Sequence, residues 1–441
     1  MGEISAAISK MTTQPEKLLA AVMPVEITPP IGVRLEGYGV RKDPSIDVHD
    51  PLFATLLVLK SGNAGVAIVT FDLIAVNLAF TTRVRTALSP VLGIPAESIL
   101  VAATHTHAGP AGFLGRVPLL SPDEDPYLQE NVLRRVIGAA AWVNHHLQPA
   151  QLGVGQGQVQ GIGSNRNDPL NGQADDQVTI LRVDSADGKP LAVLMNYGCH
   201  PTVLGPNNLA ISADYPGAAR AALTKIYPHT AFLFVNGATG DVSTRFTRRG
   251  QDFDEVERVG RILAGEVLKQ MQVITPLQDV SLSGRVGPLK LSLRPLPSAE
   301  TAENQLNQLS AELERMRSAN APHGEIRKAV TRMEGAQVQL ARAQSSGGET
   351  SVDTQVQVLR IGPLALLTLP GEPFASTVLK IKAQSPVHPT AIVSYGNDYR
   401  GYFPDIAAIK AETYEAMSSP FDETAADQLA QASLALLTGS A

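Results

Sequence analysis

The sequence contains 441 residues, of which 44% are hydrophobic, and it carries a formal net charge of −6. This composition is typical of a globular protein with a large core, and the lack of a basic run argues against a nucleic-acid partner. No stretch reaches about 18 uninterrupted apolar residues, so we expect no integral membrane segment. Residues 1–19 lack the continuous apolar run of a secretory signal peptide, and we expect them to be a loose tail on a cytoplasmic protein.

From residue 20 onward, short apolar runs separated by turns alternate with helical patterns. The apolar runs predict buried strands at 52–59, 66–71, 98–103, 178–183, 191–197, 232–235, 356–361, 364–369 and 390–395. The helical patterns cover 82–89, 126–146, 214–226, 254–271 and 422–437. This alternation predicts an α/β fold with a large mixed β-sheet layered with helices, but periodicity alone does not give the strand order.

Residues 298–345 differ from the rest of the chain because they are rich in Ala, Glu, Gln, Arg and Leu. Apolar residues recur at helical spacing on both sides of a break at 318–324, namely Leu306, Leu309, Leu313, Met316, Ile326, Val330 and Met333. This pattern predicts an inserted helical hairpin. We interpret it as an insertion that packs on the main domain. The alternatives are a lid and a dimer arm, and the second leaves a homo-oligomer open.

Two histidines follow the strand expected at 98–103, in the sequence Thr-His-Thr-His-Ala-Gly-Pro at 104–110. His105 and His107 are two residues apart, so an extended backbone would point both imidazoles the same way. Two imidazoles on one face can share one metal ion. The alternative is a pair of surface or capping histidines.

A third histidine and a glutamate also follow expected strands. His200 lies after 191–197, and Glu372 lies in a Pro-Gly-Glu-Pro turn after 364–369. Glu372 could ligate zinc, act as a general base, or be a solvated turn residue. Three histidines at strand ends, in a chain with nine, favour a metal or catalytic cluster. The single cysteine, Cys199, lies beside His200, and we interpret it as a buried core residue rather than a nucleophile or ligand.

Small residues at 236–243 follow the strand expected at 232–235, and they would allow the backbone to approach a pocket closely. Ser243 could be a nucleophile only with a base beside it. Otherwise this turn is structural, or it supplies backbone N–H donors to an oxyanion. Tyr402 and Tyr414 belong to a tyrosine-rich stretch, and by residue type alone they indicate packing.

Taken together, these motifs resemble the neutral/alkaline ceramidase family from about Val22 onward. The resemblance rests on the order and spacing of Gly37-Tyr38-Gly39, His49-Asp50-Pro51-Leu52, the histidine motif at 104–110, Asn165-Arg166, His200-Pro201-Thr202, Gly240-Asp241-Val242-Ser243, Gly371-Glu372 and the pair Tyr402 and Tyr414. The sequence departs from the family pattern at Ala108 and at Thr244-Arg245. The resemblance implies one catalytic domain over 20–441 that contains the hairpin at 298–345. We expect a short bacterial-type member without a C-terminal β-sandwich domain.

The resemblance also implies a role for each site residue. It implies a zinc ion bound by His105, His200, Glu372 and Tyr402. It implies that His107 assists catalysis, Arg166 lines the site, and Tyr414 donates a hydrogen bond to the reacting carbonyl. Ser243 matches a serine proposed as a nucleophile, a role that metal-activated water makes unnecessary.

The implied activity is that of a zinc-dependent amidohydrolase, which cleaves a linear N-acyl amide of a small-molecule substrate. An esterase or lactonase with the same zinc site is the first alternative. Another metal-assisted hydrolysis and a metal-stabilised scaffold protein are the others. A scaffold would have a closed site with four ligands, whereas an enzyme leaves one position open above a pocket.

Overall fold

The computed structural model describes residues 17–115, 123–278, 280–345 and 348–439. One sheet of this described part has eight strands: β1 (Leu18–Glu26), β3 (Phe53–Ser61), β4 (Ala64–Phe71), β5 (Ile99–Ala103), β6 (Gln148–Gln158), β8 (Gln177–Ser185), β9 (Pro190–Tyr197) and β11 (Ala231–Asn236). Their order in the sheet is β11-β9-β8-β6-β1-β3-β4-β5. The pairs β11–β9 and β4–β5 are parallel, and the other pairs are antiparallel. The large mixed sheet expected from the sequence is therefore confirmed.

A second sheet has the order β13-β14-β15-β17 and consists of β13 (Leu282–Ser292), β14 (Ser351–Ile361), β15 (Leu364–Leu369) and β17 (Thr390–Ser394). Three short pairs complete the strands: β2 (Asp47–Val48) with β10 (Ala210–Ile211), β7 (Ser164–Asn165) with β12 (Val242–Ser243), and β16 (Glu372–Pro373) with β18 (Tyr402–Phe403). β1 begins at Leu18, so Leu18 and Leu19 belong to the large sheet and not to the expected loose tail. Residues 1–16 of that tail lie outside the described residues.

The helices are α1 (Leu78–Leu92), α2 (Pro126–His145), α3 (Asp214–Ile226), α4 (Phe253–Met271), α5 (Ala299–Ser318), α6 (His323–Ser345), α7 (Ala375–Gln384), α8 (Ile406–Lys410), α9 (Tyr414–Ser418) and α10 (Ala425–Thr438). A 3₁₀ turn, η1 (Ala96–Ser98), precedes β5. Several helices begin at a side-chain cap. The Asp252 carboxylate, for example, accepts the Glu255 N–H at the start of α4. No helix within the described ranges combines the length and apolar character needed to cross a membrane.

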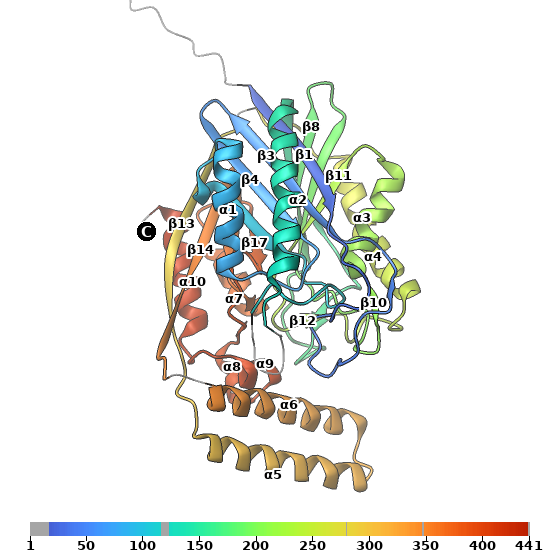
Figure 1. The fold of residues 1–441 in the computed structure, drawn as a ribbon, viewed down its shortest axis with the longest axis vertical. Helices are drawn as coiled ribbons and strands as arrows, with labels where there is room; N and C mark the ends of the chain where they lie inside the picture. The colour runs from blue at the N-terminus through green and yellow to red at the C-terminus, as the bar shows by residue number, and fades with distance from the viewer. Residues whose placement is uncertain (1–16, 116–122, 279, 346–347, 440–441) are drawn as a thin grey trace, which may run out of the picture.

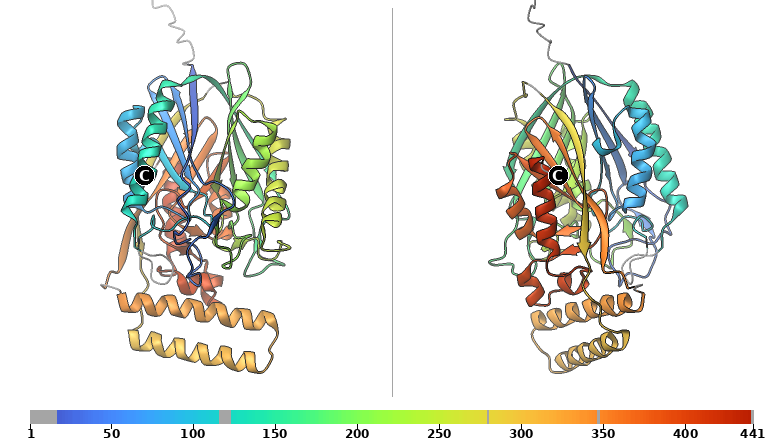
Figure 2. Two further views of the ribbon diagram at one scale, coloured as in Figure 1. Left: turned by 45° about the vertical axis from the view of Figure 1, so that its right-hand side comes forward. Right: turned by 90° about the vertical axis from the view of Figure 1, so that its left-hand side faces the viewer.

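Figures 1 and 2 show the two sheets and the helices around them, and the buried apolar clusters lie between these layers. One buried apolar cluster joins residues of the eight-stranded sheet, such as Leu57 and Leu194, to residues of the second sheet, such as Leu366. α1 and α2 pack over the β1–β5 half of the large sheet, and α3 and α4 pack over the β6–β11 half. α7 and α10 pack on the second sheet.

The helical pair α5 and α6 is inserted within a β-hairpin. β13 and β14 pair along their whole length, and Ser292 lies opposite Ser351. The chain between these two residues leaves the sheet, forms α5 and α6, and returns. The pair lies across one end of the molecule, next to α8 and α9 (Figures 1 and 2).

Candidate functional site

The candidate site forms where the segments that follow β5, β9, β15 and β17 converge. The Asn236 side-chain amide at the end of β11 donates to the Thr104 carbonyl beside β5 at 3.2 Å. The Ser394 hydroxyl at the end of β17 donates to the Gly237 carbonyl. These bonds tie the strand ends together, and they bring His105, His200 and Glu372 into one buried cluster.

The proton positions on two histidines are set by backbone carbonyls. His105 Nδ1 lies 2.7 Å from the Ile74 carbonyl oxygen, and His200 Nδ1 lies 3.2 Å from the Val242 carbonyl oxygen. A carbonyl only accepts, so each Nδ1 carries a proton, and a neutral ring presents its Nε2 lone pair to the cluster. A hydrogen bond from the second ring nitrogen to a carbonyl is the usual support for a histidine that binds a metal.

Glu372 faces these two nitrogens. Its Oε2 lies 2.9 Å from His200 Nε2 and 3.9 Å from His105 Nε2. Burial alone raises the pKa of Glu372, but His200, His105 and the Tyr399 hydroxyl outweigh it and lower that pKa to about 2. Burial lowers the pKa of His105 to about 3. A buried carboxylate facing imidazole lone pairs requires a cation or a proton between them.

The spacing of these atoms fits a metal ion. Ligand atoms bound to a tetrahedral zinc ion lie roughly 3.3 Å apart, because each bond is about 2.0–2.1 Å long. The two distances from Glu372 Oε2 to the histidines, 2.9 and 3.9 Å, bracket this value. Two imidazole nitrogens and one carboxylate oxygen are donors that suit zinc better than magnesium.

His107 joins the same cluster. Its Nε2 lies 3.2 Å from His105 Nε2, and the ligand atoms of His105, His107 and His200 all lie within 4.8 Å of one another. Burial, followed by the neighbouring His105 and His200, lowers the pKa of His107 well below its usual value. The backbone of Gly37 covers the ring, since a Cβ atom at Gly37 would lie 2.4 Å from His107 Nδ1. The geometry therefore admits His107 either as a further ligand or as a neutral base beside the metal.

Two tyrosines hold Glu372 in place. The Tyr399 hydroxyl donates to Glu372 Oε1 at 2.6 Å, and the Tyr395 hydroxyl donates to Oε2 at 3.3 Å. The Tyr395 ring also stacks on the His105 ring at 3.7 Å between centroids. The sequence indicated packing for the stretch that contains Tyr399 and a strand end for Tyr395, and only the folded chain shows that both hydroxyls donate to Glu372.

Tyr402 connects Arg166 and Tyr414 to Glu372. β16 pairs with β18 so that Glu372 lies beside Tyr402. Arg166 Nη2 donates to the Tyr402 oxygen at 3.2 Å and to the Gly240 carbonyl at 2.7 Å. The Tyr414 ring meets the Tyr402 ring edge to face at 5.9 Å, and burial raises the pKa of Tyr414 to about 12. Both tyrosines are therefore close to the cluster, and Tyr414 is a hydroxyl donor at neutral pH.

A buried ion pair that the sequence did not indicate supports Arg166. Arg166 Nε donates to Glu415 Oε1 at 2.6 Å, and Asn167 donates to the other oxygen at 3.2 Å. Burial on its own lowers the pKa of Arg166, but Glu415 and Tyr402 outweigh it and raise that pKa well above its usual value. The guanidinium is thus a fixed positive charge beside the Tyr402 oxygen.

Ser243 is buried next to His200 but is not paired with a base. The backbone N–H of His200 donates to the Val242 carbonyl at 3.1 Å, and this bond places the segments around His200 and Ser243 side by side. Ser243 Oγ accepts the Arg245 N–H at 3.4 Å, and no histidine or carboxylate within the described ranges hydrogen-bonds to it. Cys199 is fully buried, and burial raises the pKa of its thiol, so it is not a thiolate.

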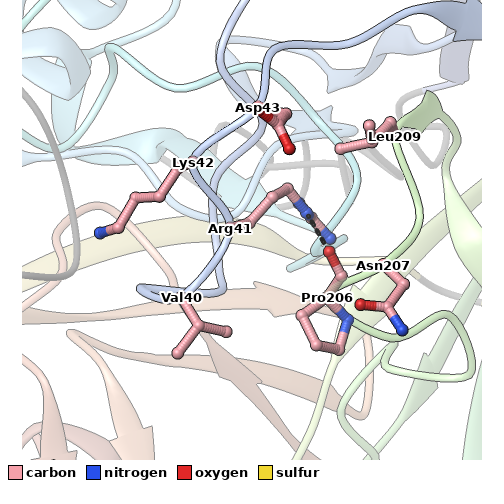
Figure 3. A pocket seen from close by; sticks show the side chains of 7 residues that line it. All are labelled: Val40, Arg41, Lys42, Asp43, Pro206, Asn207 and Leu209. Carbon is pink, nitrogen blue, oxygen red and sulfur yellow. Dashed lines mark hydrogen bonds between the residues drawn. The ribbon is translucent and has the colours of Figure 1, made fainter.

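A surface pocket of about 440 Å³ adjoins the His107 loop and is lined by Val40, Arg41, Lys42, Asp43, Pro206, Asn207 and Leu209 (Figure 3). Arg41 connects this pocket to the cluster, because Nη1 donates to the His107 carbonyl at 2.8 Å and Nε donates to the Pro206 carbonyl at 3.3 Å. The guanidinium therefore fixes the loop that carries His107.

Comparison with known proteins identifies the family. Residues 24–246 match the family model described as neutral/alkaline non-lysosomal ceramidase, N-terminal. The chain belongs to this family. The matched region contains His105, His107, Arg166, His200 and Ser243, so these residues lie in the part of the chain that defines the family.

Individual relatives match this chain at low sequence identity and over only part of their own length. The neutral ceramidase of Mycobacterium tuberculosis is 21% identical over 277 residues, which are 55% of this chain and 43% of that protein. Neutral ceramidase A of Dictyostelium discoideum is 28% identical over 138 residues, which are 28% of this chain and 19% of that protein. The match thus spans less than half the length of these relatives.

The fold agrees over almost the whole chain with the crystal structure of the neutral ceramidase from Pseudomonas aeruginosa. The TM-score is 0.74 at 18% identity, and the match covers 97% of this chain and 75% of that chain. The family fold therefore includes the region of Glu372, Tyr402 and Tyr414, which lies beyond the segment matched by the family model.

Proposed function

We propose that this protein is a zinc-dependent amidohydrolase that cleaves the N-acyl bond of a small-molecule amide, the type of reaction for which its relatives are named. The observation that carries the proposal is the convergence of the His105 and His200 Nε2 lone pairs on the Glu372 carboxylate. In this proposal residues 20–441 form one catalytic unit, and the hairpin at 298–345 is an insertion within it.

His105, His200, Glu372 and Tyr402 would hold the metal. A zinc ion bound there supplies Lewis acidity, which lowers the pKa of water and polarises an acyl carbonyl. Burial and the Glu372 charge raise the pKa of Tyr402 well above its usual value, so this hydroxyl would keep its proton until a metal ion displaces it. The positive charge of Arg166 next to the Tyr402 oxygen acts in the opposite direction and favours the phenolate form that a ligand requires.

His107 and Tyr414 would act on the substrate directly. Hydrolysis adds hydroxyl to the acyl carbon and a proton to the amide nitrogen, which leaves poorly as an anion. His107 is neutral at physiological pH, so it can take a proton from water and pass it to the departing nitrogen. Tyr414 keeps its proton and can donate a hydrogen bond to the carbonyl oxygen as negative charge develops there.

The test is a panel of N-acyl amides and esters with matched acyl chains, assayed with the purified chain before chelation, after chelation and after zinc is restored. We expect amide cleavage that chelation abolishes and zinc restores. The same assay with His107→Ala tests the proposed proton transfer, which this variant should impair. His146→Ala is its matched control, because His146 is exposed and contacts Trp142. Cleavage of esters alone would favour the esterase or lactonase alternative. Amide cleavage that chelation leaves unchanged would refute the zinc dependence of the reaction.

A further inference from the structure

The hairpin α5–α6 reaches the candidate site through helix α9. α6 packs directly on α9, which begins at Tyr414 and contains Glu415 (Figures 1 and 2). α9 is only five residues long, so its own backbone hydrogen bonds cannot fix its position. Its place in the fold therefore depends on what packs around it.

Two arginines bind the end of α9, one from α6 and one from the segment between β13 and α5. Arg294, which follows β13, directs Nη2 at the Ala416 carbonyl at 2.6 Å, the Met417 carbonyl at 2.8 Å and the Ser419 carbonyl. Arg342, on α6, donates from Nη1 to the Ser419 carbonyl at 2.9 Å. The last carbonyls of a helix have no partner within it, so a cation at this end satisfies them and opposes their negative potential.

α6 and α9 also approach unusually closely at one residue. A Cβ atom at Gly335 of α6 would lie 2.6 Å from the Met417 Cβ atom. Real Cβ atoms do not approach that closely, so any side chain at 335 would move the two helices apart. Alanine favours a helix more than glycine does. A loss of order in α9 after Gly335→Ala would therefore come from this contact and not from a weaker α6.

From α9 the contacts continue to the cluster. Glu415 binds Arg166 at 2.6 Å, and Arg166 in turn donates to the Tyr402 oxygen at 3.2 Å. Tyr414, the first residue of α9, packs against the Tyr402 ring. The position of α9 therefore determines where the Tyr414 hydroxyl lies and where Glu415 holds the Arg166 charge beside Tyr402.

We propose that Arg342 and Gly335 of the inserted hairpin, together with Arg294 in the segment that leads into it, are positioning residues that hold α9 and orient Tyr414 and the Glu415–Arg166 pair. The part of this inference that concerns catalysis rests on the proposed amidohydrolase function. The part that concerns α9 does not, because it follows from contacts that exist whatever the substrate is.

The first measurement is hydrogen–deuterium exchange on the full chain, followed at residues 413–419. The Met417 and Ser419 amides bond to the Thr413 and Glu415 carbonyls, so their exchange reports opening of α9. We expect Arg342→Ala to speed this exchange at least about tenfold, the factor that one charge-assisted hydrogen bond is worth. Gly335→Ala removes no hydrogen bond, and we expect it to speed the exchange because the added methyl group separates α6 from α9.

Two controls match these variants. Arg317→Ala removes an exposed arginine of the same hairpin that pairs with Glu314 at its surface. Gly265→Ala adds a methyl group to a helical glycine with no atom within 4 Å of the new position. Neither control should change exchange at 413–419.

The second measurement separates positioning from general support. With an amide substrate, Arg342→Ala and Gly335→Ala should lower kcat about tenfold, change KM less, and leave metal content intact. In a Tyr414→Phe background the further loss from Arg342→Ala should shrink, because part of its effect passes through that hydroxyl.

Unchanged exchange at 413–419, or faster exchange with an unchanged kcat, would overturn the proposal. A wild-type chain that cleaves no amide would refute the proposed function instead. In that case faster exchange confined to α9 would still support the role of Arg342 and Gly335 in holding this helix.

Discussion

The Tyr399 hydroxyl allows a direct test of how the carboxylate of the site is held. Tyr399 donates to Glu372 Oε1 at 2.6 Å, and this carboxylate is 2% exposed, so water cannot readily replace the lost donor. A hydrogen bond to a charged group contributes about 1.5–3 kcal/mol, which corresponds to roughly 10–150-fold in a binding constant. Partners that support metal ligands typically change metal affinity by about 10–100-fold when mutated. Tyr399→Phe should therefore weaken zinc binding by one to two orders of magnitude.

The assay is competition for zinc between the protein and a chromophoric chelator of known affinity. Tyr395→Phe should have a smaller effect, because its hydroxyl is 3.3 Å from Glu372 and also pairs with Thr239 at 2.7 Å. Tyr127→Phe is the matched control, because this tyrosine is exposed on α2.

The ranking of the three variants is the decisive result. Zinc affinity in Tyr399→Phe equal to that of the wild type would show that the Tyr399 hydroxyl does not support Glu372 as a metal ligand. A larger loss in Tyr395→Phe than in Tyr399→Phe would contradict the ranking, because the longer bond would then be the stronger support.

Three further predictions concern single residues. His107→Ala should retain the metal but lose about 10²–10⁴-fold in kcat, the usual contribution of a general acid or base, and loss of bound metal would instead make His107 a ligand. Ser243→Ala should keep kcat within a few-fold, since no base accompanies this hydroxyl among the described residues, whereas a loss above about a thousandfold would restore it as nucleophile. Burial raises the pKa of Asp214 from 3.8 to about 6, so the folded state binds this proton more tightly than the unfolded state, and the stability it contributes below pH 4 is lost as the pH rises to 6. Urea unfolding gives the difference in the free energy of unfolding between the wild type and Asp214→Asn, and this difference should change by about 3 kcal/mol across that interval. A difference that stays constant with pH would contradict the raised pKa of Asp214.

The sequence predicted the fold class and several elements because buried periodicity is local. α3, for instance, spans 214–226 as expected, since its apolar face repeats regularly. β6 was not predicted, because Gly153, Gly155 and Gly157 resemble turn residues. In the fold these glycines leave room for neighbours, since a Cβ atom at Gly153 or Gly155 would meet Ile274, and one at Gly157 would meet Glu266.

The cluster was partly visible in the sequence for a similar reason. His105, His200 and Glu372 each follow a buried strand, and strand ends are where sites form. Tyr399 and Glu415 carried no such signal. The role of a tyrosine hydroxyl or a helical glutamate depends on which side chain the rest of the chain brings to it, and that partner lies 27 residues away for Tyr399 and 249 for Glu415.

We expect one zinc ion to bind between His105, His200, Glu372 and Tyr402. The most direct test is a crystal of the zinc-loaded protein with anomalous diffraction measured at the zinc absorption edge. We expect one strong peak about 2 Å from His105 Nε2, His200 Nε2, a Glu372 oxygen and the Tyr402 oxygen. A peak at another position, or none after loading with one equivalent of zinc, would contradict it.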